Sequence, residues 1–334
     1  MHAPVGPAGI SETPETFPLF ERFPALSSIP RARLCELPSP IDRVTVASGR
    51  EIWIKRDDLD APVCGGNKAR SLEFLLGGLS RGDSVITVGG AGSTHVLCTL
   101  VHAARVGVTV DAMRWRHDTN PVADMVSDRV MGMIDRAPGR SSAFALLSAK
   151  YRAYRRRVRF IPIGGSTPLG VLGHVNAALE LARQIADGEM PMPDRIVVPL
   201  GSGGTTAGLL LGLAIAGLPI TVVGARVGPR LFVNRVAVLG LARRAASLIR
   251  SVSGEAPAAI EASRLRIVHH VYGGAYGRPL AGASSAANIL QTSAGIALDD
   301  TYSAKAWVAA GDELRNAKGT VLFWLTFDAR CLTN

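Results

Sequence analysis

One lysine in this chain stands where its amine could react with an aldehyde. Lys68 follows two glycines and an asparagine, and an apolar helical pattern begins directly after it. The positive end of a helix dipole disfavours an ammonium group, so the pKa of an amine in the first turn falls. A neutral lysine amine bonds to carbonyl carbon atoms. The segment favours an amine that captures a carbonyl compound; a surface lysine after a turn is the alternative.

Two glycine-rich turns, each between an apolar strand and a helix, predict anion-binding sites. Residues 201–205 (GSGGT) direct backbone N–H groups and two hydroxyls toward one spot, which suits a phosphate. This turn is neither a Walker A loop nor a dinucleotide fingerprint, since Thr206 stands at the last fingerprint position. Residues 89–95 (GGAGSTH) form a second turn that suits a carboxylate. Plain tight turns without a ligand are the alternative for both.

Two tyrosines complete the set of groups that could do chemistry. Tyr276 lies in a glycine-rich segment (VYGGAYGRP, 271–279), and Tyr302 lies in DDTYSAK at 299–305. One amine, one phosphate turn, one carboxylate turn and two phenols match pyridoxal-phosphate (PLP) chemistry on an amino acid. In that chemistry the cofactor accepts electrons, while the protein binds phosphate, orients the substrate and moves protons.

The elements that must position these groups alternate between strand and helix. Strands are predicted at 84–88 and 195–200, and helices at 95–105 and 206–216. Repeated strand–turn–helix units imply parallel sheets covered by helices on both faces.

Earlier in the chain, the apolar runs 43–46 and 51–55 flank Ser48 and Gly49 and predict a β-hairpin. The proline-rich residues 1–30 predict an extended arm.

Composition narrows the class of protein. Hydrophobic residues make up 47% of 334 residues, enough for a large core, and the net charge is +10. The four cysteines have no CxxC spacing and no histidine cluster, so neither a metal site nor a disulfide framework is predicted. No signal peptide or membrane-spanning run is found, which favours a cytoplasmic protein. The basic run 150–159 predicts a solvated helix face, and nucleic-acid binding is the disfavoured alternative.

Five ordered blocks resemble the D-cysteine desulfhydrase / 1-aminocyclopropane-1-carboxylate deaminase family of PLP enzymes. They are KRDDLDAPVCGGNKARSLEF (55–74), IPIGGSTPLGVLGHVNAALE (161–180), LGSGGTTAGLLL (200–211), GIALDDTYSAK (295–305) and the strand at 319–323. The resemblance implies the type II PLP fold, an α/β fold like that of the tryptophan synthase β subunit. It further implies a large PLP-binding domain (1–70 and 166–334), a small domain (71–165), mostly parallel sheets and a homodimer.

The resemblance also assigns roles by matching position. Lys68 would be the Schiff-base lysine, preceded by Asn67, and Ser303 would meet the pyridine nitrogen of PLP. The cofactor phosphate would be held by Gly201, Ser202, Gly203, Gly204 and Thr205. The substrate carboxylate would be held by Ser93, Thr94 and His95. Tyr276 and Tyr302 would face the substrate, so the catalytic set would be Lys68, Tyr302, Ser93 and Tyr276.

Three departures from the family pattern stand out. Gly92 replaces a glutamine, which predicts room for a larger substrate, and Thr94 replaces an asparagine. The family's His-Thr-Gly-Gly after the last strand is absent from residues 325–328 (LTFD). The C-terminal wall of the site is therefore expected to differ.

Ser303 favours one reaction. A hydroxyl leaves the pyridine nitrogen neutral, which suits β-elimination from a D-cysteine-like amino acid to a keto acid and ammonia. The deaminases have glutamate here, which suits ring opening. Ring opening and a specialised β-replacement remain alternatives, and a PLP-binding protein without turnover is the alternative from another class. The expected partner is a small amino acid, with no nucleic acid or membrane.

Overall fold

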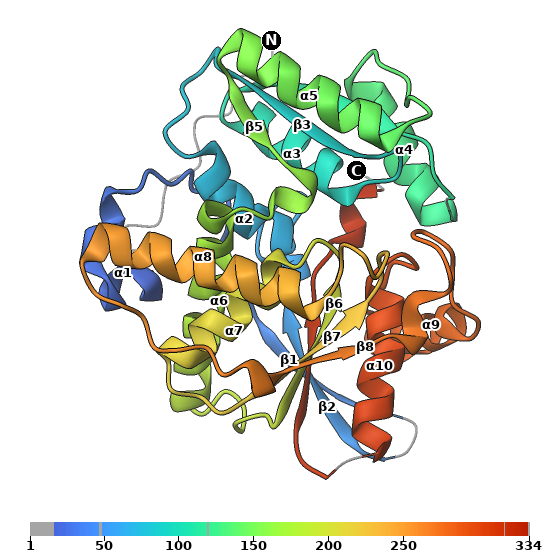
Figure 1. Cartoon of the computed structure of the whole chain (residues 1–334). Helices are drawn as coiled ribbons and strands as arrows, with labels where there is room; N and C mark the ends of the chain where they lie inside the picture. The colour runs from blue at the N-terminus through green and yellow to red at the C-terminus, as the bar shows by residue number, and fades with distance from the viewer. Residues whose placement is uncertain (1–16, 47–48, 119, 317, 333–334) are drawn as a thin grey trace, which may run out of the picture.

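The computed structural model describes residues 17–46, 49–118, 120–316 and 318–332, and it contains two β-sheets (Figure 1). The larger sheet has the order β1-β2-β9-β6-β7-β8, in which only the β1–β2 pair is antiparallel. The smaller sheet has the order β4-β3-β5 and is parallel throughout. The strands are β1 (Ile41–Thr45), β2 (Glu51–Arg56), β3 (Ser84–Gly90), β4 (Thr109–Trp115), β5 (Arg159–Ile161), β6 (Arg195–Leu200), β7 (Thr221–Arg226), β8 (Leu265–Val268) and β9 (Val321–Leu325).

Helices cover both faces of each sheet, as the alternating pattern predicts. In the larger unit α6, α7 and α8 lie on one face and α10 on the other; in the smaller unit α3 and α5 lie on opposite faces (Figure 1). The helices are α1 (Pro18–Arg22), α2 (Asn67–Leu76), α3 (Thr94–Arg105), α4 (Pro121–Met133), α5 (Ser142–Arg156), α6 (Pro168–Ala186), α7 (Gly204–Ile215), α8 (Arg235–Ser253), α9 (Ala283–Ala294) and α10 (Ser303–Asn316). No helix of the described residues is long and apolar enough to cross a membrane.

Most predicted elements are confirmed. The hairpin pairs Ile41–Thr45 with Glu51–Arg56, although Ser48 lies outside the described residues. Residues 150–156 of the basic run form the last turns of α5, whereas 157–159 lie beyond the helix and Arg159 begins β5. The strands of the smaller sheet all lie inside the range predicted for the small domain. The exact domain boundaries stay a prediction.

The prediction of an extended N-terminal arm is wrong for residues 17–30. Phe17, Leu19, Phe23 and Leu26 are buried in the core beside α6. This part of the arm forms α1 and a short 3₁₀ turn, because apolar side chains spaced three to four residues apart gain by facing one surface. Residues 1–16 lie outside the described part of the chain.

A buried set of charges fixes the helix that carries Lys68. Arg70 of α2 pairs with Asp57 at 2.7 Å and with Glu180 of α6 at 3.0 Å, and Lys55 donates to Glu180 at 2.6 Å. Burial alone would raise the pKa of Glu180, but Arg70 and Lys55 outweigh it and lower that pKa to about 2. The carboxylate is therefore ionised and holds α2, α6 and β2 together.

Replacing this carboxylate with an amide should destabilise the fold strongly. Glu180→Gln leaves two buried cations without their shared partner, which typically costs about 3–5 kcal/mol. Glu21→Gln is the matched control, because Glu21 pairs with Arg183 of the same helix on the exposed surface, where a pair is worth less than about 1 kcal/mol. Urea denaturation at neutral pH measures both. Equal losses in the two variants would contradict the importance of the buried set.

Candidate active site

The turns that carry the predicted residues meet at the carboxyl ends of the parallel strands of the larger sheet. Lys68 follows β2, the phosphate turn follows β6, and Thr326 follows β9. One hydrogen bond joins the first two turns directly, because the Asn67 amide donates to the Thr205 hydroxyl at 2.7 Å. The lysine and the anion turn are therefore neighbours, as the sequence predicts.

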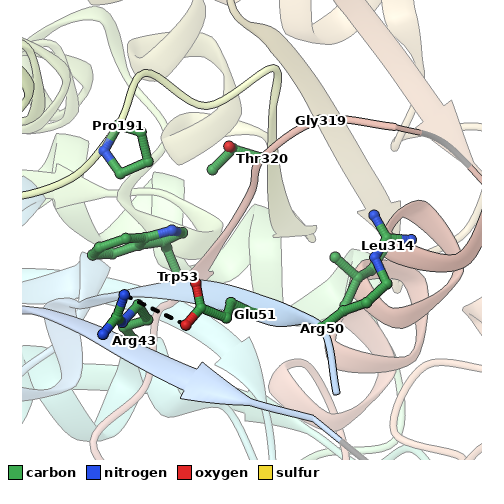
Figure 2. Close-up of a pocket in the computed structure, with 8 residues that line it drawn as sticks. All are labelled: Arg43, Arg50, Glu51, Trp53, Pro191, Leu314, Gly319 and Thr320. Atoms are coloured by element: carbon green, nitrogen blue, oxygen red, sulfur yellow. Dashed lines mark ion pairs between the residues drawn. The ribbon is translucent and has the colours of Figure 1, made fainter. Parts of the chain in front are cut away.

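A hollow of about 470 Å³ lies at the other end of these strands. It is a shallow surface beside Trp53 and Thr320, at the amino ends of β2 and β9, where Arg43 and Glu51 form an ion pair between adjacent strands (Figure 2). Ligands of open α/β sheets bind at the carboxyl ends of the strands. This hollow is therefore separate from the site described here.

The turn before Lys68 has a conformation that only glycine adopts easily. Gly66 has a φ of 107°, and a Cβ there would lie 2.3 Å from the Thr326 carbonyl oxygen. The same oxygen accepts from the Asn67 N–H at 3.0 Å, and Asp328 accepts from the Gly65 N–H at 3.2 Å. Residues 326–328, where the family motif is lost, thus brace the lysine turn mainly through backbone contacts.

Burial tunes the Lys68 amine. Loss of hydration lowers the pKa of Lys68 to about 8, and the nearby Cys98 thiol opposes this only weakly. Burial also lowers the pKa of Lys305 to about 8, so the shift alone does not identify the reactive amine. Position distinguishes the two lysines. Lys305, on α10, donates to the Tyr272 carbonyl at 3.1 Å, whereas Lys68 directly follows Asn67, which donates to Thr205 of the phosphate turn.

This pKa predicts a pH profile for cofactor capture. Only the neutral amine reacts, so the rate at which the PLP-free protein takes up PLP should rise about tenfold per pH unit below 8 and level off above it. With an ordinary lysine, the rate of PLP uptake would keep rising until about pH 10.4. Stopped-flow absorbance between pH 6 and 10 measures the profile. A rate that still climbs above pH 9 would contradict the lowered pKa, and Lys305→Met should leave the profile unchanged.

The phosphate turn has the geometry of an anion cradle. Gly203 has a φ of 89°, and α7 begins at Gly204, so the free N–H groups of the helix lie at this turn. Ser202 hydrogen-bonds Ser166 at 2.7 Å, and a Cβ at Gly204 would approach the Ser166 hydroxyl to 2.8 Å. Ser166 was not predicted. The sequence offered a sign of it, because Gly164, Gly165 and Ser166 form another glycine–serine turn like the one at 201–205.

The second anion turn brings its three predicted residues to the start of α3. Ser93 caps the helix, with the Val96 N–H 3.4 Å from its oxygen, and Ser93 and Thr94 are buried. His95 is hydrogen-bonded at Nε2 to Thr87 at 3.0 Å; burial and the Lys68 ammonium lower its pKa to about 3. The imidazole is therefore neutral, and any contact it makes with a carboxylate carries no ionic component.

Gly92 does not enlarge the site as the sequence suggested. A Cβ at this position would lie 2.5 Å from the Cβ of Ala123 and 2.7 Å from its carbonyl oxygen. The start of α4 therefore fills the room left by the missing side chain.

The two phenols form a pair. The hydroxyls of Tyr276 and Tyr302 are hydrogen-bonded to each other, and their ring centroids are 6.0 Å apart. Burial raises the pKa of Tyr276 to about 12 and raises that of Tyr302 well above its usual value. Both phenols therefore keep their protons at neutral pH and can act as acids. Tyr302 also reaches the phosphate turn, since a Cβ at Gly201 would lie 3.7 Å from its ring.

Asp299 holds Tyr302 and Ser303 at the start of α10. Its carboxylate accepts from the Tyr302 N–H at 2.8 Å and from the Ser303 N–H at 3.0 Å. This role was not predicted, although an aspartate just before a helix is a common capping signal. The Ser303 hydroxyl is fully buried and lacks a well-aligned partner among the described residues. Burial raises the pKa of Asp299, and the nearby Ser303 hydroxyl opposes that rise.

These residues fit a phosphorylated aldehyde that carries a ring nitrogen. A buried hydroxyl without a good partner is costly unless a ligand satisfies it, and Ser303 offers one to such a nitrogen. The turn at Gly203 and Gly204 offers N–H groups to a phosphate, and Lys68 offers a partly neutral amine. Fold and site together define a two-sheet α/β enzyme of the PLP-binding kind.

Comparison with known proteins agrees with this class. Residues 33–326 match the model of a family described as pyridoxal-phosphate dependent enzyme. The chain is 35% identical to nocardicin C-9′ epimerase of Nocardia uniformis subsp. tsuyamanensis, over 91% of this chain and 94% of that protein. It is 30% identical to D-cysteine desulfhydrase of Salmonella paratyphi C, over 92% and 96%. The solved structure of an ACC deaminase homologue superposes with a TM-score of 0.73 at 30% identity, covering 94% and 95%.

The chain belongs to the pyridoxal-phosphate dependent enzyme family, and its cofactor is pyridoxal 5′-phosphate. The predicted type II fold and cofactor are confirmed. The roles of the individual site residues stay predictions.

Proposed function

We propose that this enzyme catalyses β-elimination on a small D-amino acid that carries a leaving group at Cβ, releasing a keto acid and ammonia. The observation that carries the proposal is the buried Ser303 hydroxyl at the end of the cofactor site, adjacent in sequence to a protonated phenol. A hydroxyl, unlike a carboxylate, does not keep a pyridine nitrogen protonated. The D-cysteine desulfhydrase named among the relatives supports the same reaction class.

Bound PLP supplies an electron sink for the carbanion that forms when the α-proton leaves. Lys68 would hold the cofactor through its amine and then take the α-proton at Nζ, which its lowered pKa permits near neutral pH. Ser93 is the alternative base, since its oxygen lies at the carboxylate turn. The N–H groups and hydroxyls at Ser93 and Thr94 would orient the substrate carboxylate.

The leaving group would receive its proton from the phenol pair. Tyr302 hydrogen-bonds Tyr276, and both keep their protons at neutral pH, so a thiolate leaving Cβ meets an acid rather than a base. The chain thus supplies a base and an acid in one site.

The test is a comparison of three substrates on the purified enzyme with PLP bound. D-cysteine and β-chloro-D-alanine should release keto acid, and 1-aminocyclopropane-1-carboxylate should not. Release from the cyclopropane alone would replace elimination with ring opening. A visible spectrum that never changes with any amino acid would indicate a PLP-binding protein without turnover. The homodimer implied by the resemblance remains a prediction for size-exclusion chromatography.

Inversion at Cα is a second candidate. The 35% identity to nocardicin C-9′ epimerase over nearly the whole of both chains favours it. Lys68 and a phenol would catalyse inversion together, because Lys68 would remove the proton at Cα and the phenol would donate a proton to Cα from the other face. Incubation of single enantiomers in D₂O distinguishes the two functions. Elimination gives keto acid, whereas inversion gives the mirror-image amino acid, deuterated at Cα, without keto acid.

A further inference from the structure

Asn120, at the start of α4, links the unit of the smaller sheet to the loops that carry both phenols. Its amide nitrogen donates to the Gly277 carbonyl at 2.7 Å and to the Thr301 hydroxyl at 2.8 Å. Its amide oxygen caps α4 by accepting from the Ala123 N–H at 2.9 Å. Asn120 is only 4% exposed, so these hydrogen bonds are shielded from competing water.

Each of the two acceptors of the Asn120 amide nitrogen is adjacent to one phenol. Gly277 follows Tyr276 and Thr301 precedes Tyr302, and Thr301 is itself buried. A single amide group therefore holds the Gly277 backbone next to Tyr276 and the Thr301 side chain next to Tyr302. Because the two loops are 24 residues or more apart in sequence, no local turn fixes the distance between the phenols.

The residues just before Asn120 make further contacts with the same loop. The His117 ring lies edge-on to Tyr276, with centroids 5.0 Å apart, and packs so closely on Gly90 that a Cβ there would lie 2.3 Å from His117 Nε2. Asp118 pairs with Arg278 at 3.0 Å, but both side chains are more than half exposed, so this pair contributes little. Among these contacts between the two units, those of Asn120 are the buried ones.

We infer that Asn120 is a positioning residue that holds the phenol pair in register with the carboxylate turn and Lys68. The inference rests on the proposed function for what the phenols do, and on the contacts above for what Asn120 does. Tyr276 and Tyr302 come from the larger unit, whereas Ser93 and Thr94 come from the smaller one. Asn120 ties the two units at the point where the acid must reach the leaving group.

Asn120→Asp separates this role from helix capping. Aspartate is as good an N-cap as asparagine, so α4 keeps its start. The carboxylate has no N–H to donate, so the link to the Gly277 carbonyl is lost and an anion faces that carbonyl. The Thr301 link survives only if its hydroxyl turns to donate to the carboxylate. Asn120→Ser keeps a capping oxygen without the charge and controls for repulsion. Asn234→Asp is the matched control, because Asn234 caps α8 in the same way and its amide nitrogen contacts only its own loop, at Arg230 and Leu231.

The first measurement is hydrogen–deuterium exchange of the PLP-free protein. Peptides covering 273–279 and 299–302 should exchange about tenfold faster in Asn120→Asp and Asn120→Ser, with the rest of α4 unchanged. Asn234→Asp should match the wild type at these peptides. Unchanged protection of both loops in the Asn120 variants would overturn the inference, whatever the enzyme turns over.

The second measurement uses the leaving group. The sulfur of D-cysteine must take up a proton as it leaves, whereas chloride leaves without one. Moving the phenol away from the leaving group should therefore slow elimination from D-cysteine only. Asn120→Asp should lower keto-acid release from D-cysteine about 10²-fold and from β-chloro-D-alanine less than about threefold. Equal losses on both substrates would overturn the positioning role. If the wild type releases keto acid from neither, the proposed function fails and the exchange measurement alone decides the inference.

Discussion

Replacing Lys68 with alanine should abolish turnover and the visible absorbance band that PLP gains on covalent capture. The amine is the group that fixes the cofactor and the first candidate for α-proton removal, so its loss should reduce kcat by at least about 10³-fold. Lys68 is half-buried, and its turn is held by the backbone contact between Asn67 and the Thr326 carbonyl oxygen, so the fold should survive the change. An end-point assay of keto-acid release measures the loss of turnover, and a visible spectrum of the variant measures the loss of the absorbance band.

Lys305 is the natural control for this experiment. Burial lowers its pKa to about 8, as for Lys68, yet its amine donates to the Tyr272 carbonyl. Lys305→Met should keep the band and most of the activity. Borohydride reduction of the wild type followed by peptide mapping should place the cofactor on the peptide containing Lys68. A label on Lys305 would show that the wrong amine has been chosen.

Tyr302→Phe should have the next largest effect, and only on substrates that need a proton on the leaving group. Loss of a general acid typically costs about 10²–10⁴-fold. Release of keto acid from D-cysteine should fall within that range, whereas release from β-chloro-D-alanine should fall far less. Steady-state assays of both substrates across pH 6–9 provide the comparison.

Tyr276→Phe tests whether the partner phenol is itself the acid. The variant removes one hydrogen bond to Tyr302 and leaves the Tyr302 hydroxyl in place. A loss of about tenfold or less is expected for one such bond. A larger loss for Tyr276→Phe than for Tyr302→Phe would exchange the two roles.

The sequence predicted the parts of the site that local chemistry determines. Lys68, the turn at Gly203 and the cap at Ser93 each sit between a strand and a helix, and glycine or a capping side chain there restricts the backbone by itself. These segments could therefore be placed from the residues alone. The direct Asn67–Thr205 contact is the consequence of two such turns at one edge of a sheet.

What the sequence did not reveal depends on contacts between distant segments. Asn120 and His117 contact Gly277 and Tyr276, which are more than 150 residues away in sequence. Ser166 faces Ser202 only because two turns from separate strands meet. The bracing at Thr326 uses a carbonyl oxygen, which every residue possesses, so the loss of the family motif there was a poor guide to the structure.

The contact between Gly65 and Asp328 has a consequence for how the enzyme is made. It joins positions 263 residues apart, and the neighbouring Thr326 carbonyl closes the backbone around Gly66 and Asn67. During synthesis from the N-terminus, the reactive lysine leaves the ribosome well before residues 326–328, whose backbone orients its turn. We therefore expect the lysine turn to be complete, and ready to hold the cofactor, only after residue 328 has been translated.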